Sequence, residues 1–200
     1  MRIFAGILIA FVLWFTVFVL RPMNFWLMMS FATSLLILLS IIWGRPLLQW
    51  KELSFKNAAL GVASAALLYG IFWAGNILLP YFIPNHAEDL NTIYANKGSL
   101  SPAFVALLLF FPIGFGEELF WRGFIQNKLA LKCGKWAALF ITTGVYAAVH
   151  IPTMNPVLIL AALVCGAFWG SIYLLTGSIV PVLISHMLWD MSVFVLWPIK

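Results

Sequence analysis

Residues 3–20 read IFAGILIAFVLWFTVFVL, a run without a single charged side chain. A helix that crosses the hydrocarbon core of a bilayer needs about 20 mostly apolar residues. The run ends at Arg21-Pro22, and no small-residue cleavage site of a signal peptide follows it. We therefore predict a membrane-spanning helix at this position, and not a cleaved leader.

The composition of the whole chain agrees with this first run. Of the 200 residues 64 % are hydrophobic and 8 % are charged, whereas soluble domains carry about 25 % charged residues. A soluble domain of this length cannot bury so much apolar surface, because small domains leave a large share of their surface in water. No Gly-X-Y repeat and no acidic or Ser/Pro-rich tract indicates a fibrous or disordered chain. We predict an integral membrane protein that is surrounded by the lipid bilayer.

Further apolar segments follow at residues 23–43, 58–79, 104–131, 136–149, 157–175 and 179–197. Lipid allows only helices and closed barrels as spanning structures, so we predict an all-α, polytopic bundle of about seven transmembrane helices. Pro102 lies at an expected helix start. The fourth segment is either one long helix or two helices that are broken near Gly114 and Gly116. The polar residues 80–101 are predicted to form a loop with room for a short surface helix.

The basic residues lie singly or in small groups between the apolar segments, and they do not form the patch of a nucleic-acid-binding protein. Lys and Arg accumulate in the cytoplasmic loops of membrane proteins. A cytoplasmic N-terminus leaves only Arg21, Lys97 and Lys200 outside. It places on the cytoplasmic side Arg2, Arg45, Lys51, Lys56, Lys128, Lys132 and Lys135. We predict this orientation, in a bacterial inner or plasma membrane.

Ionisable side chains also occur inside the predicted spans, where each costs several kcal/mol and usually marks function. They are Glu117, Glu118, Arg122, His150, His186 and Asp190. None lies in the first three predicted helices. We therefore divide the single domain, residues 1–200, into scaffold helices with a polar loop (residues 1–101) and catalytic helices (residues 102–197).

The spacing of these residues predicts which of them face one another. Glu118 and Arg122 are four residues apart and can pair on one helix face. Glu117 lies about 100° around the same turn and can point elsewhere. His186 and Asp190 are also four apart, so the carboxylate can orient the imidazole.

His150 ends its own span, just before Pro152, so three helices each contribute polar groups. Buried charges must meet partners, which predicts that these groups converge. A carboxylate base together with histidines can activate water against a carbonyl group and stabilise the resulting oxyanion. The pattern favours amide hydrolysis within the bilayer as the reaction class. The peptide substrate is then itself associated with the membrane.

Three motifs in this order resemble the CPBP family, which includes the CAAX prenyl proteases of type II and the bacteriocin-processing or Abi proteins. Glu117-Glu118-Leu-Phe-Trp-Arg122 resembles its EExxxR motif, and His186-Met-Leu-Trp-Asp190 resembles its HxxxN/D motif. Tyr146 and His150 resemble FxxxH, with Tyr in place of the usual Phe, which we take as a mild aromatic exchange. The resemblance covers residues 110–191.

The resemblance implies a glutamic intramembrane protease without a cofactor. Glu117 would activate water with help from His150, and Glu118 and Arg122 would brace the site. His186 and Asp190 would line the oxyanion side, or Asp190 would orient His186, since a carboxylate donates to an oxyanion only when protonated. The substrates that the resemblance implies are prenylated C-termini, peptide leaders, and membrane-anchored sorting or signal segments.

Other interpretations stay open. The histidines and carboxylates could hold zinc, although HExxH is absent and Arg122 opposes a cation. A transporter or a peptide-binding scaffold could carry the same residues, although the internal repeats of transporters are absent. Each charged pair could also be purely structural. We expect Cys133 and Cys165 to be unreactive packing residues. Most tryptophans are expected to lie at the membrane interface. Trp121 and Trp189 are expected either to pack in the bundle or to line a substrate groove.

Overall fold

The computed structural model describes residues 1–44, 52–95 and 100–199, and all regular structure within these residues is helical. Among them six helical segments are long and apolar enough to cross a membrane, and a shorter apolar one spans Val180–Leu196. The predicted all-α bundle of about seven membrane helices is confirmed. The helices are α1 (Arg2–Phe15), α2 (Phe25–Gly44), α3 (Phe55–Phe82), α4 (His86–Ala95), α5 (Pro102–Leu108), α6 (Phe115–Glu118), α7 (Asn127–Cys133), α8 (Lys135–Ala148), α9 (Pro156–Thr176) and α10 (Val180–Met191).

Widened helical turns extend several of these helices. α1 continues through Thr16–Leu20, and α10 continues through Ser192–Leu196. The turns Leu119–Gln126 join α6 to α7, so that one continuous helical segment carries the Glu-Glu-x-x-x-Arg motif. α3 runs past its predicted end at residue 79 and includes Pro80, which a membrane helix tolerates.

The fourth span does break, but earlier than predicted. The backbone leaves the helical region at Phe111 (φ −151°, ψ 123°), whereas Gly114 and Gly116 are helical. Pro112 disfavours helical geometry for the residue before it, which explains the position of the break. The predicted start holds: Ser101 caps α5 by accepting a hydrogen bond from the Phe104 amide at 3.3 Å, and Pro102 is the first helical residue.

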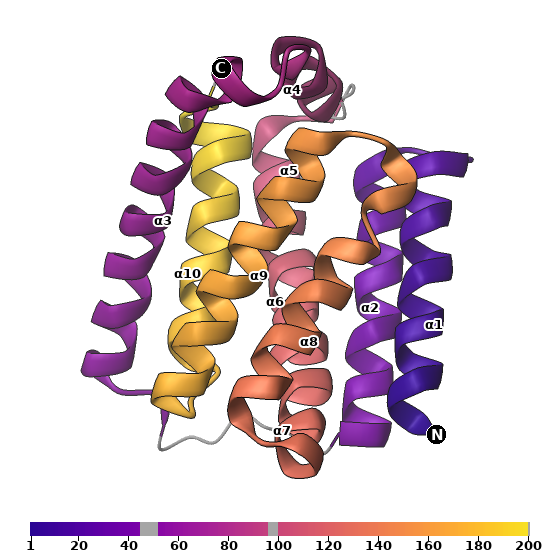
Figure 1. The fold of residues 1–200 in the computed structure, drawn as a ribbon, viewed down its shortest axis with the longest axis vertical. Coiled ribbons are helices and arrows are strands. Elements are labelled where there is room, and N and C mark those ends of the chain that lie inside the picture. Colours follow the sequence, from indigo (N-terminus) through magenta and orange to yellow (C-terminus); the bar gives the residue numbers. More distant parts are fainter. Residues whose placement is uncertain (45–51, 96–99, 200) are drawn as a thin grey trace.

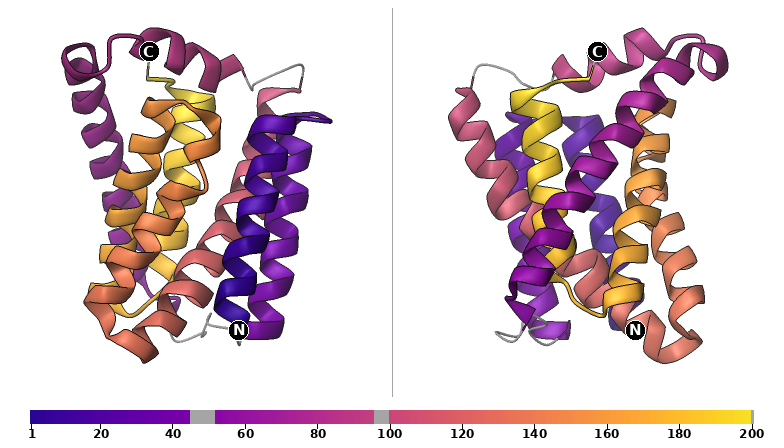
Figure 2. Two further views of the ribbon diagram at one scale, coloured as in Figure 1. Left: turned by 45° about the vertical axis from the view of Figure 1, so that its right-hand side comes forward. Right: turned by 90° about the vertical axis from the view of Figure 1, so that its left-hand side faces the viewer.

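The motif helix runs through the middle of the bundle (Figures 1 and 2). α1 and α2 lie side by side on one flank, and α3 packs against α10 on the other. α6 and the turns Leu119–Gln126 contact α2, α8, α9 and α10. α4 lies across the end of the bundle opposite the N-terminus (Figure 1). This arrangement surrounds the Glu-Glu-x-x-x-Arg motif with helices on all sides.

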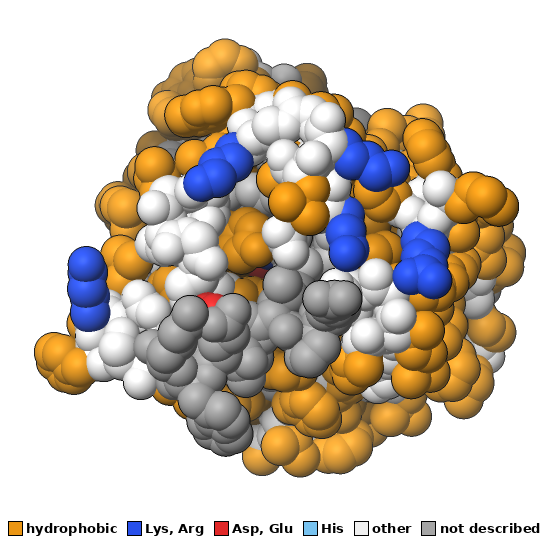
Figure 3. Space-filling model, turned by 90° about the horizontal axis from the view of Figure 1, so that it is seen from below, with side chains coloured by type: hydrophobic (Ala, Val, Ile, Leu, Met, Phe, Trp, Pro, Cys, Tyr) orange, Lys and Arg blue, Asp and Glu red, His pale blue; other side chains and the backbone are white. Residues whose placement is uncertain are grey.

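The two ends of the bundle differ in charge. Basic side chains surround the end at which the N-terminus lies (Figure 3), and we call this end the basic face. Its described basic residues are Arg2, Lys56, Lys128, Lys132 and Lys135. Four other basic residues of the predicted charge pattern lie outside the described residues, namely Arg45, Lys51, Lys97 and Lys200. Large apolar side chains such as Phe31, Trp73 and Phe140 are exposed between the two ends, as contact with lipid requires.

Several tryptophans do not lie at the membrane interface as expected. Trp14, Trp26 and Trp169 are buried inside the bundle. Aromatic rings of this size fill the space between helices and bury a large apolar area. Burial inside the bundle therefore replaces the expected interfacial role at these positions.

α3 and α10 approach each other closely because a small residue stands at their crossing. A Cβ atom on Gly61 would meet Ile184 Cβ at 2.7 Å and the Pro181 carbonyl oxygen at 3.0 Å. Ser64 and Ala65 are buried on the same helix. Small residues at such intervals allow membrane helices to pack backbone to backbone, where van der Waals contact supplies the stabilisation.

Replacing Gly61 by Ala should therefore destabilise the protein by about 1–3 kcal/mol, since overpacking of this size forces the helices apart. Gly70→Ala on the same helix is the matched control, because nothing lies within 4 Å of its added Cβ. The control should be neutral, or stabilise by up to about 1 kcal/mol through helix propensity. Denaturant titration in mixed micelles measures both variants. Equal stability of the two would contradict close packing at Gly61.

Candidate active site

All six ionisable residues predicted for the site are buried in the bundle, and none is more than 5 % exposed. Glu117, Glu118 and Arg122 come from the central motif helix, and His150 follows α8. His186 and Asp190 come from α10. The predicted convergence of these residues follows from the way in which α8 and α10 pack around the motif helix.

Glu118 is the centre of a charged network. Its Oε1 atom accepts hydrogen bonds from Arg122 Nη1 at 2.8 Å and from His186 Nδ1 at 2.7 Å. Arg122 Nη2 also donates to the carbonyl oxygens of Cys165 (3.4 Å) and Gly166 (3.2 Å) on α9. The predicted Glu118–Arg122 pairing is present, and through these contacts it links the motif helix to α9 and α10.

His186 lies between two carboxylates. Its Nε2 atom is 3.4 Å from Asp190 Oδ2, the neighbour predicted from the four-residue spacing. The shorter contact, to Glu118, joins two helices, and helical spacing within one segment does not reveal it. The imidazole also stacks on Trp169 with ring centroids 3.8 Å apart, and the Trp169 indole donates to Ser185 Oγ at 3.1 Å. With carboxylate oxygens at both nitrogens, the ring can donate on both sides as an imidazolium.

Glu117 points away from this network, as the helical geometry predicts. Its Oε2 atom accepts a hydrogen bond from the Tyr146 hydroxyl at 2.8 Å, and both residues are buried. The Tyr146 ring packs edge-on against Trp121, and the Arg122 guanidinium lies 5.1 Å from its centre. The interpretation of Tyr146 as a mild exchange for Phe is therefore wrong, since its hydroxyl binds Glu117 directly.

His150 has a hydrogen-bond partner at each ring nitrogen. Trp14 Nε1 on α1 donates to Nε2 at 3.1 Å, and Nδ1 lies 2.9 Å from the Tyr146 carbonyl oxygen. An indole N–H can only donate, so Nε2 must be the unprotonated nitrogen and Nδ1 the donor. The neutral Nδ1–H tautomer satisfies both contacts. Trp14 lies within an apolar run, so sequence analysis had no signal for this role.

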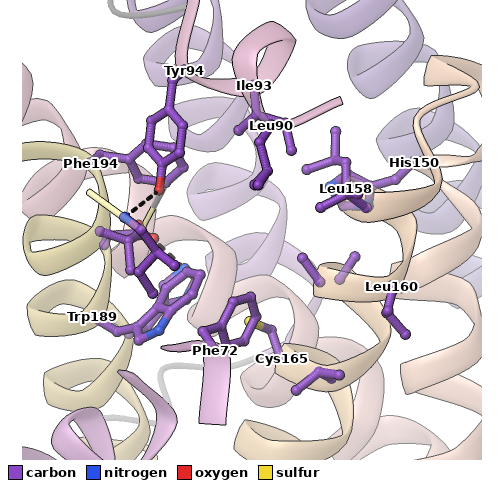
Figure 4. Close-up of a pocket in the computed structure, with 18 of the residues that line it drawn as sticks. Phe72, Leu90, Ile93, Tyr94, His150, Leu158, Leu160, Cys165, Trp189 and Phe194 are labelled. Atoms are coloured by element: carbon purple, nitrogen blue, oxygen red, sulfur yellow. Dashed lines mark hydrogen bonds and ion pairs between the residues drawn. The ribbon is translucent and has the colours of Figure 1, made fainter. Parts of the chain in front are cut away.

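An apolar cavity of about 280 Å³ ends at these residues. Glu117, Tyr146, His150, His186 and Asp190 line its polar end. Figure 4 shows the apolar walls, with Phe72 and Trp189 on one side and Leu158 and Leu160 on the other. A carboxylate thus faces a largely apolar space, where charges interact more strongly than in water.

Of the remaining predictions for the site, some are confirmed and others are wrong. Trp189 lines the cavity, whereas Trp121 is fully buried in packing. Cys165 is buried beside the site, but Cys133 is exposed at the end of α7, so its interpretation as a packing residue is wrong. In the described part of the chain, no three His, Cys, Asp or Glu side chains are placed to hold a metal ion.

Comparison with known proteins identifies the same segment of the chain. Residues 98–192 match the family model described as Type II CAAX prenyl endopeptidase Rce1-like. This segment contains all six candidate residues, and the match confirms the resemblance to CAAX-type proteases. No curated protein and no solved structure matches the chain.

Replacing Arg122 by Met should destabilise the protein by about 3–5 kcal/mol, because the fully buried Glu118 carboxylate would lose its permanent counter-charge. Met keeps much of the apolar volume of the Arg stem. The control is Lys132→Met on exposed α7, which should change stability by no more than about 0.5 kcal/mol. The free energy of unfolding in detergent micelles measures both. Wild-type stability of the Arg122 variant would rule out a bracing role for this pair.

Proposed function

We propose that this chain, whose residues 98–192 match the Rce1-like family of type II CAAX prenyl endopeptidases, hydrolyses a peptide bond of a membrane-associated protein or peptide with water activated by Glu117. One observation carries this proposal. Glu117 faces the apolar cavity, while its neighbour Glu118 is bound to Arg122 and His186. The Glu117 carboxylate is thus available to react with a substrate, whereas the Glu118 carboxylate stabilises the fold.

The reaction proceeds in two steps at Glu117. The oxygen of a water molecule attacks the carbonyl carbon of the scissile peptide bond, and the Glu117 carboxylate accepts the proton that the water loses. In the second step the carbon–nitrogen bond of the tetrahedral intermediate breaks, and Glu117 passes the proton to the leaving amine. The products are a new carboxyl terminus and a new amino terminus.

The other polar groups act on the charge that develops. The peptide oxygen becomes negative in the intermediate, and a preorganised positive or donating group nearby stabilises it. His186 and Asp190 line the cavity on the side suited to this role, and the 3.4 Å contact between them supports Asp190 as the residue that orients the imidazole. His150, held by Trp14 and Tyr146, lines the same cavity and assists Glu117. No cofactor is part of this proposal.

Tyr146 holds the Glu117 carboxylate in place for this chemistry. Its hydroxyl donates to Oε2, which leaves Oε1 for the water molecule. The backbone carbonyl of the same residue holds His150. We therefore propose Tyr146 as a positioning residue for both groups.

Glu117→Gln should abolish processing while leaving the fold intact, because an amide cannot accept the proton of the attacking water. Profiling of terminal peptides in host membranes, with wild type and variant at matched abundance, detects the loss of defined processed termini. Glu88→Gln on the surface helix α4 is the control and should process normally. Identical profiles for wild type and Glu117→Gln would reject catalysis by Glu117 and favour a binding or transport role.

Tyr146→Phe should lower kcat about tenfold or more and leave KM unchanged, since a hydrogen bond to a charged group contributes about 1.5–3 kcal/mol. Tyr69→Phe removes a hydroxyl that donates to the Trp197 carbonyl oxygen away from the cavity, and serves as the matched control. Steady-state kinetics on a peptide identified by the terminal profiling separates kcat from KM. An unchanged kcat for Tyr146→Phe would contradict the positioning role.

A further inference from the structure

We propose that the active-site cavity receives its substrate from the extracytoplasmic side of the membrane, and that this substrate is the membrane-anchored segment of an exported polypeptide. This inference rests on the proposed function, because it concerns the substrate of that endopeptidase. It names the side of the membrane and the class of polypeptide, which the motifs leave open.

The first observation is the position of the cavity along the bundle. Helices that begin at the basic face line the cavity mostly with residues from their middle and far ends, such as Phe72 of α3 and Phe194 beyond α10, although α10 also contributes His186 from its second turn. Helices that end at the basic face line it with residues from their first turns to just past their middle, such as Met29 of α2 and both Leu158 and Trp169 of α9. The cavity therefore extends through the half of the bundle that faces away from the basic face and reaches just past the middle of the helices.

The outer boundary of the cavity is α4, which lies across that far end. Leu90, Ile93 and Tyr94 of α4 line the cavity (Figure 4). Asn155 ties α4 to the start of α9, since its Nδ2 atom donates to the Asp89 carbonyl oxygen at 3.0 Å. The cavity thus extends from the catalytic residues at the middle of the bundle to the helix that covers its far end.

On the other side of the catalytic residues, the described helices pack tightly. Gln126 Nε2 donates to the Gly170 carbonyl oxygen at 2.9 Å, which joins the motif helix to α9. A Cβ atom on Gly170 would meet Leu139 Cδ1 at 2.6 Å, so α8 and α9 are in direct contact here. On the side of the basic face, this packing closes the space between the motif helix, α8 and α9.

Charge assigns the two ends to the two sides of the membrane. The basic face carries five described basic residues and Glu52, whereas the far end carries Arg21 together with the acidic Glu88 and Asp89 of α4. Basic residues close to helix ends are retained in the cytoplasm, and acidic residues have little influence on orientation. The basic face is then cytoplasmic, and the cavity lies in the outer half of the bilayer.

The position and the lining together define the substrate. Apart from its polar end, the cavity is lined by aliphatic and aromatic side chains, so the substrate must bring an apolar segment. A scissile bond that reaches Glu117 from the outer half belongs to a chain that has already crossed the membrane. A membrane-anchored leader or sorting segment of an exported polypeptide meets both conditions, and the cytoplasmic C-terminus of a lipid-modified protein does not.

Cysteine accessibility tests the side directly. In a Cys133→Ser and Cys165→Ser background, Leu158→Cys places a thiol in the cavity wall and Lys132→Cys places one on the basic face. Each variant is treated with a small, charged, membrane-impermeant methanethiosulfonate in sealed right-side-out and inside-out vesicles. We expect modification of Leu158→Cys only in right-side-out vesicles and of Lys132→Cys only in inside-out vesicles. Solubilisation in detergent checks that both thiols are reactive.

Modification of Leu158→Cys in inside-out vesicles, or of both thiols from the same side, overturns the inference. So does a cavity thiol that reacts only after solubilisation. The experiment is repeated with Glu117→Gln, where labelling should be unchanged, so its result does not depend on catalysis. If Glu117→Gln also removes processed termini, those termini should map to extracytoplasmic segments, and termini in cytoplasmic segments would overturn the assignment of the substrate.

Discussion

The structure depends on how a fully buried carboxylate is compensated at the centre of a membrane bundle. Glu118 has no exposed surface, and an unpaired charge in such surroundings costs several kcal/mol. Arg122 and His186 both bind the same oxygen of Glu118, at 2.8 and 2.7 Å. These two contacts draw α10 onto the motif helix, and the contacts of Arg122 with backbone carbonyls draw α9 onto it. Electrostatic compensation thereby fixes the relative positions of the helices that carry the catalytic candidates.

This compensation also separates the roles of two adjacent glutamates. Neighbouring carboxylates in a site of low polarity compete for the same positive charge. Here the helix points them in different directions, so that Glu118 binds Arg122 and His186, whereas Glu117 accepts a hydrogen bond from the neutral hydroxyl of Tyr146. A neutral donor orients a carboxylate without holding it in an ion pair. Glu117 therefore keeps the capacity to accept a proton, which is the property that a general base requires.

Much of this arrangement could be predicted from the sequence, because two strong sequence patterns indicate the membrane helices and the buried polar site. Long apolar runs specify membrane helices, and ionisable residues within such runs are too costly to lack partners. Contacts between helices were not predictable in the same way. The hydrogen bond from Trp14 to His150 joins residues 136 positions apart, and neither residue type indicates the other. The glycines of the fourth span predict a break near Gly114 or Gly116, whereas Pro112 determines its position at Phe111.

The cavity adds a constraint that neither the motifs nor the family match contains. Motif residues in the middle of a bundle can be reached from either side of the membrane, so they specify a reaction and leave its direction of access open. In this protein the apolar space extends from Glu117 toward α4, and the basic side chains gather at the opposite end. In the orientation that we propose, the contacts at Gln126 and Gly170 lie between the site and the cytoplasm. In the same proposed orientation, a polypeptide that is anchored in the outer half of the bilayer meets the apolar lining that leads to the Glu117 carboxylate.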